Sequence, residues 1–480
     1  MCAVTEKSFL YENVSDRLRH HIYQGTYKAG DRLPSVRALS RAFKVSINTI
    51  LQCFRQLEAD GLIYRHPRAG VFVATQPPPA VSPSVVSPLF SLLPVEVSLS
   101  EEILRYMEPH VTQDILKLGI AIPDPEIMPI SKVMQMFREV SRNEPQSAWR
   151  YVHPRGDERL IHQLARRSLN YPAPLSEADI IATNGCMEAI ELALRAVTRP
   201  GDTLAIETPT YYGALLALEV MGRKALPVPT DPVTGIDLNG LERALKQGQV
   251  AGCLITANAQ NPLGSMMPAN ARERLAAMAA RYQVPIIEND IWGDTAFGEP
   301  MPPIKAYDRD GMVLYCNSFS KTLMPGMRLG WIVPGRFFHR VMELKQITSI
   351  TTGSLPQIVT RKLIESGFYH QHVRQLRHRL QQQVAELSDL IRRFFPTNTR
   401  ITRPGGGCVL WVELPPAVDT GRLFDRALEQ GIHIFPGHVF SPGTRHTNCL
   451  RLNAGSPRSA VLERAIRQLG VLCHQQLTAV

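Results

Sequence analysis

Short apolar runs rich in β-branched residues alternate with helical patterns through the middle of this 480-residue chain. The run IIAT at 180–183 is followed by a helical repeat at 187–197 and then by TLAIE at 203–207. The same alternation continues from CLIT to MVLYC, between residues 253 and 316. Strands that alternate with helices predict a mostly parallel sheet with helices packed on it. The fold class is therefore α/β.

The alternation of strand and helix patterns ends toward the C-terminus. A long helical stretch around 356–395 is followed by strand patterns at 409–414, 432–435 and 449–453 and by a closing helix. This order predicts a small α+β domain after the large mostly parallel α/β domain.

Proline marks a boundary near the N-terminus. The stretch QPPPAVSPSVVSPLFSLLP at 76–94 holds six prolines and little periodicity, which is typical of an extended linker. We therefore divide the chain into an N-terminal module, 1–75, a Pro-rich linker, 76–110, and a large body, 111–480.

The charge of the chain is uneven. Its formal net charge is +10, and residues 1–75 hold 11 Lys and Arg against 6 Asp and Glu, so half of the surplus lies in this module. Such a cluster fits either a solvated basic face or a polyanionic partner. Neither a membrane span, a signal peptide, a disulfide framework nor a metal site is indicated, so we expect a cytoplasmic protein without a membrane partner.

The N-terminal module carries the pattern of three helices and a hairpin. Ser35 and Ser46 stand where they can cap the second and third helices, and LIYR and GVFV form two short strands around HPRA. Two helices joined by a tight turn and followed by a hairpin predict a winged helix-turn-helix.

Residues 27–73 resemble the GntR-type winged helix of bacterial transcription regulators. The resemblance implies a double-stranded DNA operator as partner, read by the start of the third helix and by the wing. Ile47 stands where the family often has Arg, so the sequence leaves open which bases are read. The DNA-binding residues implied are Arg37, Ser46, Asn48, Thr49, Arg68 and Gly70.

The motif NSFSKTLMPGMRLGW at 317–331 places one lysine after a strand, between small hydroxyls and an arginine. A lysine that attacks an aldehyde must be partly neutral, which burial near cations achieves. The hydroxyls and the arginine suit a phosphate. The motif resembles the lysine signature of fold-type I aminotransferases, which implies pyridoxal 5'-phosphate as cofactor and Lys321 as the catalytic lysine.

The same resemblance implies further site residues in the same chain order. In the family, Tyr151 reaches the phosphate of the partner subunit in a homodimer, and Arg451 grips the substrate carboxylate. The amides at 185–187 cradle the phosphate at a helix N-terminus. The cofactor-binding residues implied in this way are Tyr151, Gly185, Cys186, Met187, Tyr211, Asn261, Ser318, Ser320, Lys321 and Arg328.

The segment IIENDIWGD at 286–294 departs from the family pattern Glu-Asp-Asp-x-Tyr. Counting back three residues from Trp292, which replaces the Tyr, puts Asn289 where the family has the Asp that pairs with the pyridine nitrogen. An Asn weakens the cofactor as an electron sink. If the register slips by one residue, Asp290 serves instead. Both alternatives stay open from the sequence.

A GntR-type winged helix linked to an aminotransferase-like body is the arrangement of the MocR-type regulators. It implies a dimeric transcriptional regulator that senses an amino acid, an amine or the vitamin itself through its cofactor. The alternative is a working aminotransferase with an attached DNA-binding module. For the regulator we expect at most slow or half-reaction transamination.

Overall fold

The computed structural model describes residues 10–23, 27, 30–59, 62–66, 70–73, 92–112, 115–298, 301–443, 445–456 and 459–478. The chain forms two compact units, Met1–Ala80 and Val81–Val480. Residues 76–91, the first part of the expected linker, lie outside the described residues.

The first unit is a small helical module with a hairpin. Its elements are α1 (Leu10–Tyr23), α2 (Val36–Phe43), α3 (Ile47–Ala59), β1 (Ile63–His66) and β2 (Gly70–Val73). The side chain of Ser35 caps α2 by accepting a hydrogen bond from the amide of Ala38, and that of Ser46 does the same for Thr49 in α3. The strands pair antiparallel. The predicted caps and wing are confirmed.

The core of this unit comes from the apolar faces of its helices and from the hairpin. Leu18, Ile50, Phe54 and Leu57 are all buried in one cluster, to which Val73 of β2 also belongs. The apolar spacing of α3 therefore fixes which of its faces points inward and leaves the start of the helix for solvent.

The second unit contains an eight-stranded sheet, as predicted from the alternation of strands and helices. Its spatial order is β4-β11-β10-β9-β8-β5-β6-β7, and the five strands from β10 to β6 run parallel. The strands are β4 (Ile181–Thr183), β5 (Thr203–Thr208), β6 (Lys224–Asp231), β7 (Gly235–Ile236), β8 (Gly252–Ile255), β9 (Ile286–Asn289), β10 (Val313–Ser318) and β11 (Gly330–Val333).

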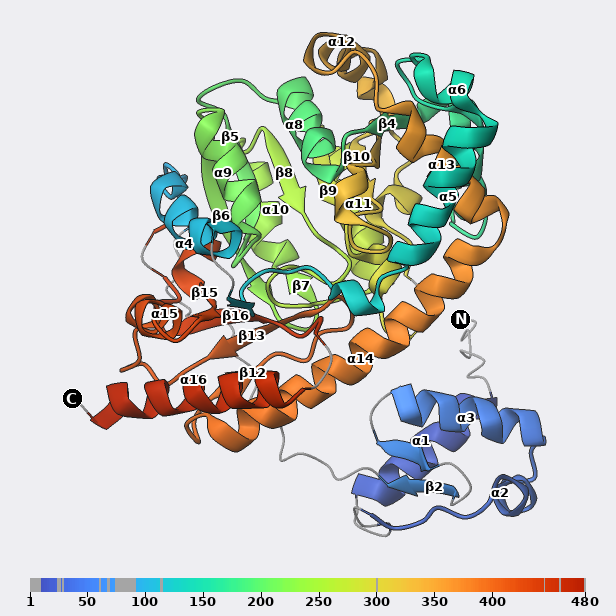
Figure 1. Ribbon diagram of the computed structural model, residues 1–480, viewed down its shortest axis with the longest axis vertical. Coiled ribbons are helices and arrows are strands. Elements are labelled where there is room, and N and C mark those ends of the chain that lie inside the picture. The colour runs from blue at the N-terminus through green and yellow to red at the C-terminus, as the bar shows by residue number, and fades with distance from the viewer. Residues whose placement is uncertain are drawn as a thin grey trace, which may run out of the picture. The chain divides into compact units, whose positions relative to one another are not determined.

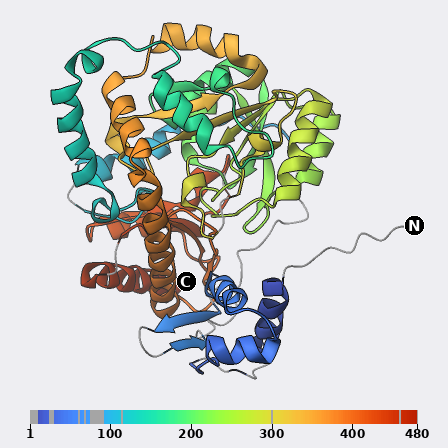
Figure 2. The same cartoon turned by 90° about the vertical axis from the view of Figure 1, so that its right-hand side faces the viewer.

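Helices cover both faces of this sheet (Figures 1 and 2). One face packs against α8 (Cys186–Val197), α9 (Tyr212–Val220) and α12 (Phe338–Thr348). The other face packs against α5 (Ile130–Asn143), α7 (Glu158–Arg167), α10 (Leu238–Lys246), α11 (Ala269–Tyr282) and α13 (Ser354–Glu365). The short α6 (Pro145–Trp149) lies beside α5 and α13. Neighbouring residues of one strand consequently face two different layers.

A smaller α+β domain follows, as predicted. Its sheet has the order β12-β13-β16-β15 and is antiparallel. The elements are β12 (Arg400–Ile401), β13 (Val409–Glu413), α15 (Thr420–Leu428), β14 (Ile432–His433), β15 (Phe435–Pro436), β16 (Cys449–Asn453) and α16 (Ala460–Thr478). The 27-residue helix α14 (Phe368–Phe394) runs from the large domain to α16 of the small one (Figure 1).

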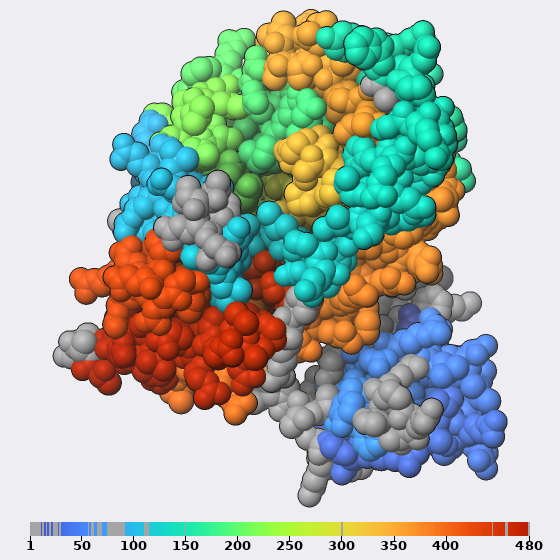
Figure 3. Space-filling view, in the orientation of Figure 1, coloured from blue at the N-terminus to red at the C-terminus, as the bar shows by residue number. Residues whose placement is uncertain are grey.

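The later part of the expected linker differs from an extended segment. Val95 forms a bridge with Ala225, and α4 (Ser100–Thr112) buries Ile103 and Tyr106. The Glu219 carboxylate accepts hydrogen bonds from the first backbone amides of this helix. Burial of apolar side chains thus makes α4 part of the body, where it lies on the surface near the small domain (Figure 3). The strand β3 (Leu116–Lys117) then pairs with β14.

No helix in the described part of the chain is long and apolar enough to cross a membrane.

Candidate functional site

Lys321 follows β10 at the carboxyl end of the parallel strands. Its Nζ donates to the carbonyl oxygen of Ala121 at 2.7 Å and lies 5.1 Å from the centre of the Trp292 ring. Burial, with the positive charges of Arg451 and Arg328 nearby, lowers the pKa of Lys321 to about 8. A substantial fraction of this amine is therefore neutral near physiological pH, which is the state that attacks a carbonyl carbon.

The turn between β4 and α8 presents groups that suit an anion. Gly185 has φ +89°, and a Cβ added to it would meet Arg328 Nη2 at 2.5 Å. Arg328 itself donates to the carbonyl oxygen of Asn184 at 3.1 Å and is exposed. The first amides of α8, from Cys186 onward, point to the same turn, so a guanidinium and a helix N-terminus converge there.

Small residues let the next strand approach this turn. Ser318 in β10 pairs with Gly330 in β11, and a Cβ on Gly330 would lie 3.0 Å from the amide nitrogen of Cys186. Ser318 and Ser320 are both buried and joined by a hydrogen bond from the Ser320 amide to Ser318 Oγ. The structure thus brings both serines toward the turn, whereas Met187 is about one-third exposed.

Asn289 and Asp290 stand on opposite faces at the end of β9. Asn289 faces α8, where its Oδ1 accepts from Cys186 Sγ at 3.5 Å. Asp290 faces the other layer and accepts from Asn258 Nδ2 at 2.8 Å and from the Tyr315 hydroxyl at 2.9 Å. Because Cys186 begins the helix next to Lys321, the amide and not the carboxylate is on the side of the lysine.

Arg451 closes the other side of the site. It projects from β16 and donates to Asn261 Oδ1 at 3.0 Å and to the carbonyl oxygen of Gly119 at 2.6 Å. Its Nε has no hydrogen-bond partner among the described residues, and no carboxylate of those residues is among the groups that shift its pKa. The guanidinium is buried between aromatic rings, those of Tyr212, Phe435 and Phe440. A buried arginine without an acid partner suits an incoming carboxylate.

Aromatic side chains complete the walls. The rings of Tyr211 and Tyr212 have their centres 4.8 Å apart. Burial and the neighbouring Tyr212 raise the pKa of Tyr211, whereas the positive charge of Arg451 lowers it. Trp292 is almost wholly buried and lacks the hydroxyl that the family's tyrosine supplies.

Two backbone contacts near Lys321 were not predicted from the sequence. A Cβ on Gly407, in the run Gly405–Gly407, would lie 3.6 Å from the Trp292 ring. The carbonyl oxygen of Ala121 holds Lys321. The glycine run in the sequence could have predicted the close approach of Gly407 to Trp292. The contact of Lys321 with Ala121 involves a backbone oxygen, which no sequence pattern predicts.

Tyr151 is apart from the other predicted cofactor residues. Its side chain is 85% exposed, and Trp149, two residues earlier, is 89% exposed. Within one chain, Trp292, Arg328 and Arg451 lie near Lys321. Asn261 contacts Arg451, and Asn289 contacts Cys186 at the start of α8. Tyr151 is exposed, and Asp290 faces the other layer of the sheet.

The first unit presents polar residues in α2 and around the start of α3. Arg37, Ser46 and Asn48 are exposed, and Thr49 is half-buried with its hydroxyl 2.8 Å from Ser46 Oγ. Gly70 has φ +119°, and a Cβ there would lie 2.8 Å from Arg32 Nε. Arg68 lies outside the described residues. The arrangement matches a recognition helix whose N-terminus is free for DNA.

Comparisons with known proteins agree with both units. Residues 10–73 match the model of the bacterial regulatory proteins of the gntR family, and residues 113–469 match that of aminotransferase class I and II. The HTH-type transcriptional regulator YjiR of Escherichia coli (strain K12) is 36% identical over 96% of this chain and 98% of its own. YdcR of the same strain, also an HTH-type transcriptional regulator, is 33% identical over 97% and 99%.

Among solved structures, the multiple substrate aminotransferase of Thermococcus profundus superposes with a TM-score of 0.73. It is 28% identical and covers 80% of this chain and 97% of its own. That aminotransferase fold and its relatives depend on pyridoxal phosphate. The chain therefore belongs to the GntR-type transcriptional regulators that carry a class I and II aminotransferase domain, the MocR-type arrangement.

Proposed function

We propose that this regulator holds pyridoxal phosphate at Lys321 and responds to an amino acid or amine that enters the same site, and that a homodimer changes its grip on DNA as a result. The observation that carries the proposal is the position of Lys321. Its partly neutral amine lies between an anion-binding turn and the uncompensated guanidinium of Arg451.

The residues present fit the cofactor. The cradle at Gly185, which a Cβ would fill, and the guanidinium of Arg328 suit its phosphate. Tyr211 would pack on the ring, Asn261 would meet the phenolic oxygen, and Asn289 would face the ring nitrogen. When bound, pyridoxal phosphate supplies an aldehyde for Lys321 and a ring that withdraws electrons.

The protein's own groups then define the effector. Arg451 holds a carboxylate in a two-pronged contact, and Lys321 accepts or returns a proton once its amine is displaced. Closure of the small domain, which carries Arg451 on β16, would follow from that contact. A coupling of about 1–3 kcal/mol would change DNA affinity roughly 5- to 150-fold.

The cofactor part is tested by absorption spectroscopy of the full chain reconstituted with pyridoxal phosphate. Wild type is expected to be yellow, and Lys321→Ala to lose the band. Lys224→Ala, which changes an exposed lysine paired with Glu96, is the matched control and keeps the band. A colourless wild type contradicts the proposal.

The regulatory part is tested with duplexes selected from a random pool by the full chain. Arg37→Ala is expected to weaken binding to the selected duplex while leaving the cofactor spectrum unchanged. Amino acids and amines are then titrated into the wild-type complex while fluorescence anisotropy reports DNA binding. Anisotropy that is insensitive to every compound that changes the cofactor spectrum contradicts the coupling.

The second candidate is a working aminotransferase, which the fold shared with the Thermococcus profundus enzyme favours. Asn289 on the side of Lys321 argues against it, because an amide does not stabilise a protonated pyridine as a carboxylate does. A multiple-turnover transamination assay across common amino acids decides. Fast turnover favours the enzyme, and a single slow half-reaction favours the sensor.

A further inference from the structure

A cavity lies behind the sheet, on the face opposite Lys321. Its volume is about 680 Å³, and its walls come from the end of β9, from α7 and from α14. Asp290 and Tyr315 line it, whereas their chain neighbours Asn289 and Cys316 face the layer of α8. The cavity is thus separate from the proposed effector site. The two are linked at the end of β9, because Asn289 faces the effector site and the next residue, Asp290, lines the cavity.

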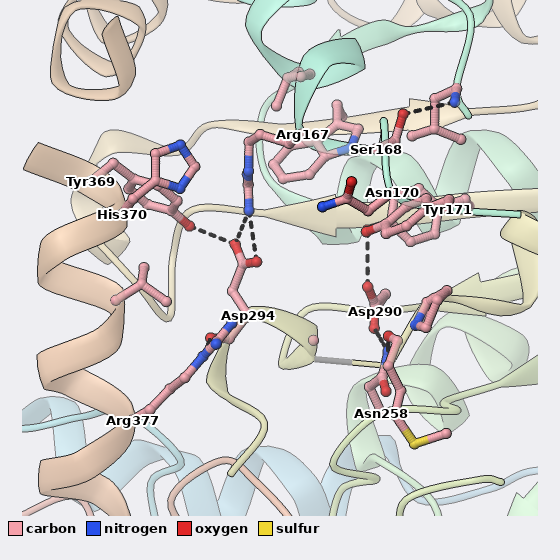
Figure 4. Close-up of a pocket in the computed structure, with 18 of the residues that line it drawn as sticks. Arg167, Ser168, Asn170, Tyr171, Asn258, Asp290, Asp294, Tyr369, His370 and Arg377 are labelled. Atoms are coloured by element: carbon pink, nitrogen blue, oxygen red, sulfur yellow. Dashed lines mark hydrogen bonds and ion pairs between the residues drawn. The ribbon is translucent and has the colours of Figure 1, made fainter. Parts of the chain in front are cut away.

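The acids of this cavity are already satisfied. Asp294, in the short turn Gly293–Thr295, accepts from Arg167 Nη2 at 2.6 Å and from the Tyr369 hydroxyl at 2.6 Å (Figure 4). Burial opposes its ionisation, but the positive charges of Arg167 and Arg377 and the hydrogen bonds from Arg167 and the Tyr369 hydroxyl together outweigh burial and lower the pKa of Asp294. Asp290 has its own donors in Asn258 and Tyr315.

Several donors of the cavity are still available. Arg377 uses Nε for the backbone oxygen of Asp294, at 2.7 Å, and its terminal nitrogens make no hydrogen bond to the described residues. The side chains of Arg374 and Asn170 and the Tyr171 hydroxyl likewise make no hydrogen bond to the described residues. Arg167 is paired with Asp294. The donors that stay available at the cavity are therefore the terminal nitrogens of Arg377 and the side chains of Arg374, Asn170 and Tyr171 (Figure 4 shows Asn170, Tyr171 and Arg377).

Part of the remaining wall is apolar, although Ser168, Asn258 and His370 line the cavity as well. Leu164, Leu175, Val373 and Trp331 line the cavity beside the tyrosines. A ligand that fits must therefore offer hydrogen-bond acceptors and negative charge at one end and an apolar body at the other. A carboxylate on a small ring or chain meets both demands, whereas a simple inorganic anion leaves the apolar walls uncovered.

We propose that this cavity is a binding site for a small organic carboxylate, held by Arg374 and Arg377 and distinct from the site at Lys321. The site supplies a second input to the regulator. The connection runs through β9, where Asp290 lines the cavity and the preceding Asn289 touches Cys186 at the start of α8.

The test is isothermal titration of benzoate into the cofactor-loaded full chain. Arg374→Gln changes an exposed side chain, so the fold is preserved, and it is expected to weaken benzoate binding at least tenfold. Arg379→Gln, an exposed arginine on the same helix that does not line the cavity, is the matched control and is expected to bind as wild type does.

Two further comparisons separate this site from others. Arg451→Gln, which disables the proposed effector site, is expected to retain benzoate binding, and neutral benzamide is expected to bind wild type at least tenfold more weakly. The proposal is overturned if benzoate does not bind wild type, if Arg374→Gln binds it normally, or if Arg451→Gln abolishes binding. Inorganic phosphate that binds as tightly as benzoate overturns the organic part of the assignment.

Discussion

At the residue scale, Asn289 is the position that most limits the chemistry of the site. It lies on the side of Lys321 and touches Cys186 through an amide oxygen. Asn289→Asp would place a carboxylate there, and we expect the half-reaction with an amino acid to accelerate at least tenfold, which corresponds to about 1.4 kcal/mol of barrier. Stopped-flow absorbance of the bound cofactor measures this rate.

Asp290→Asn provides the matched control, since it changes the neighbouring residue on the opposite face. It should leave the rate unchanged but lower thermal stability, because Asn258 and Tyr315 both donate to this carboxyl group. If the half-reaction of Asn289→Asp is as slow as that of wild type while that of Asp290→Asn is slower, then Asp290, and not Asn289, faces the ring nitrogen of the cofactor.

Glu207, at the end of β5, makes stability depend on pH. Burial raises its pKa to about 8 from an ordinary value of 4.5. The folded chain therefore keeps this proton between those pH values while the unfolded chain releases it. The free energy of unfolding must then fall as pH rises from about 4.5 to about 8, by roughly 1.4 kcal/mol per pKa unit at most.

Glu207→Gln removes that dependence, since the amide oxygen can still accept from the backbone of Thr256. Urea titrations at several pH values between 5 and 8 should show a flatter profile and higher stability at pH 8 than for wild type. Glu96→Gln, an exposed change, serves for comparison and should preserve the wild-type slope. Parallel profiles for wild type and Glu207→Gln would show that Glu207 ionises normally.

At the element scale, the start of α3 serves both stability and recognition. Ser46 Oγ accepts from the amide of Thr49, so Ser46→Ala should cost about 1 kcal/mol. In the full chain, this loss of unfolding free energy should make hydrogen exchange roughly fivefold faster for those α3 amides that exchange only when the N-terminal unit unfolds. Asn48→Ala, which removes an exposed side chain from the same turn, should weaken DNA binding and leave exchange unchanged. Equal exchange in both variants would contradict the capping role.

Local patterns predicted most elements because their causes are local. Ser35 and Ser46 cap helices through amides three residues away, and the apolar runs at 203–207 and 449–453 are strands β5 and β16. The helical stretch predicted around 356–395 is instead two helices, α13 and α14, separated by Gly367 with φ +75°. Glycine takes that conformation without strain, which breaks the helix.

Contacts between distant segments could not be predicted in this way. Whether Asn289 or Asp290 faces Lys321 depends on the pleat of β9 within the sheet, and the sequence left both open. The cavity behind the sheet joins Arg167, Asp294 and Tyr369, which come from α7, a short turn and α14. No spacing motif relates these three, because only the packing of α14 against the large domain brings them together.

At the scale of the whole molecule, two exposed aromatic side chains indicate an interface with a second copy of the chain. Trp149 and Tyr151 are 89% and 85% exposed, and large apolar side chains grouped on a surface mark interfaces. We expect Trp149→Ser to weaken a homodimer at least tenfold, measured by sedimentation velocity over a dilution series. Val471→Ser, an exposed apolar change on α16, is the control and should sediment as wild type does.

Tyr151→Phe distinguishes packing from a direct role toward the cofactor. It keeps the ring, so the dimer should persist, but it removes the hydroxyl that would reach the phosphate in the partner subunit. A hydrogen bond to a charged group contributes about 1.5–3 kcal/mol, so pyridoxal phosphate affinity should fall about 10- to 150-fold. Equilibrium dialysis measures that affinity. Unchanged affinity in a stable dimer would confine Tyr151 to the interface, and a monomeric wild type would remove both residues from the site.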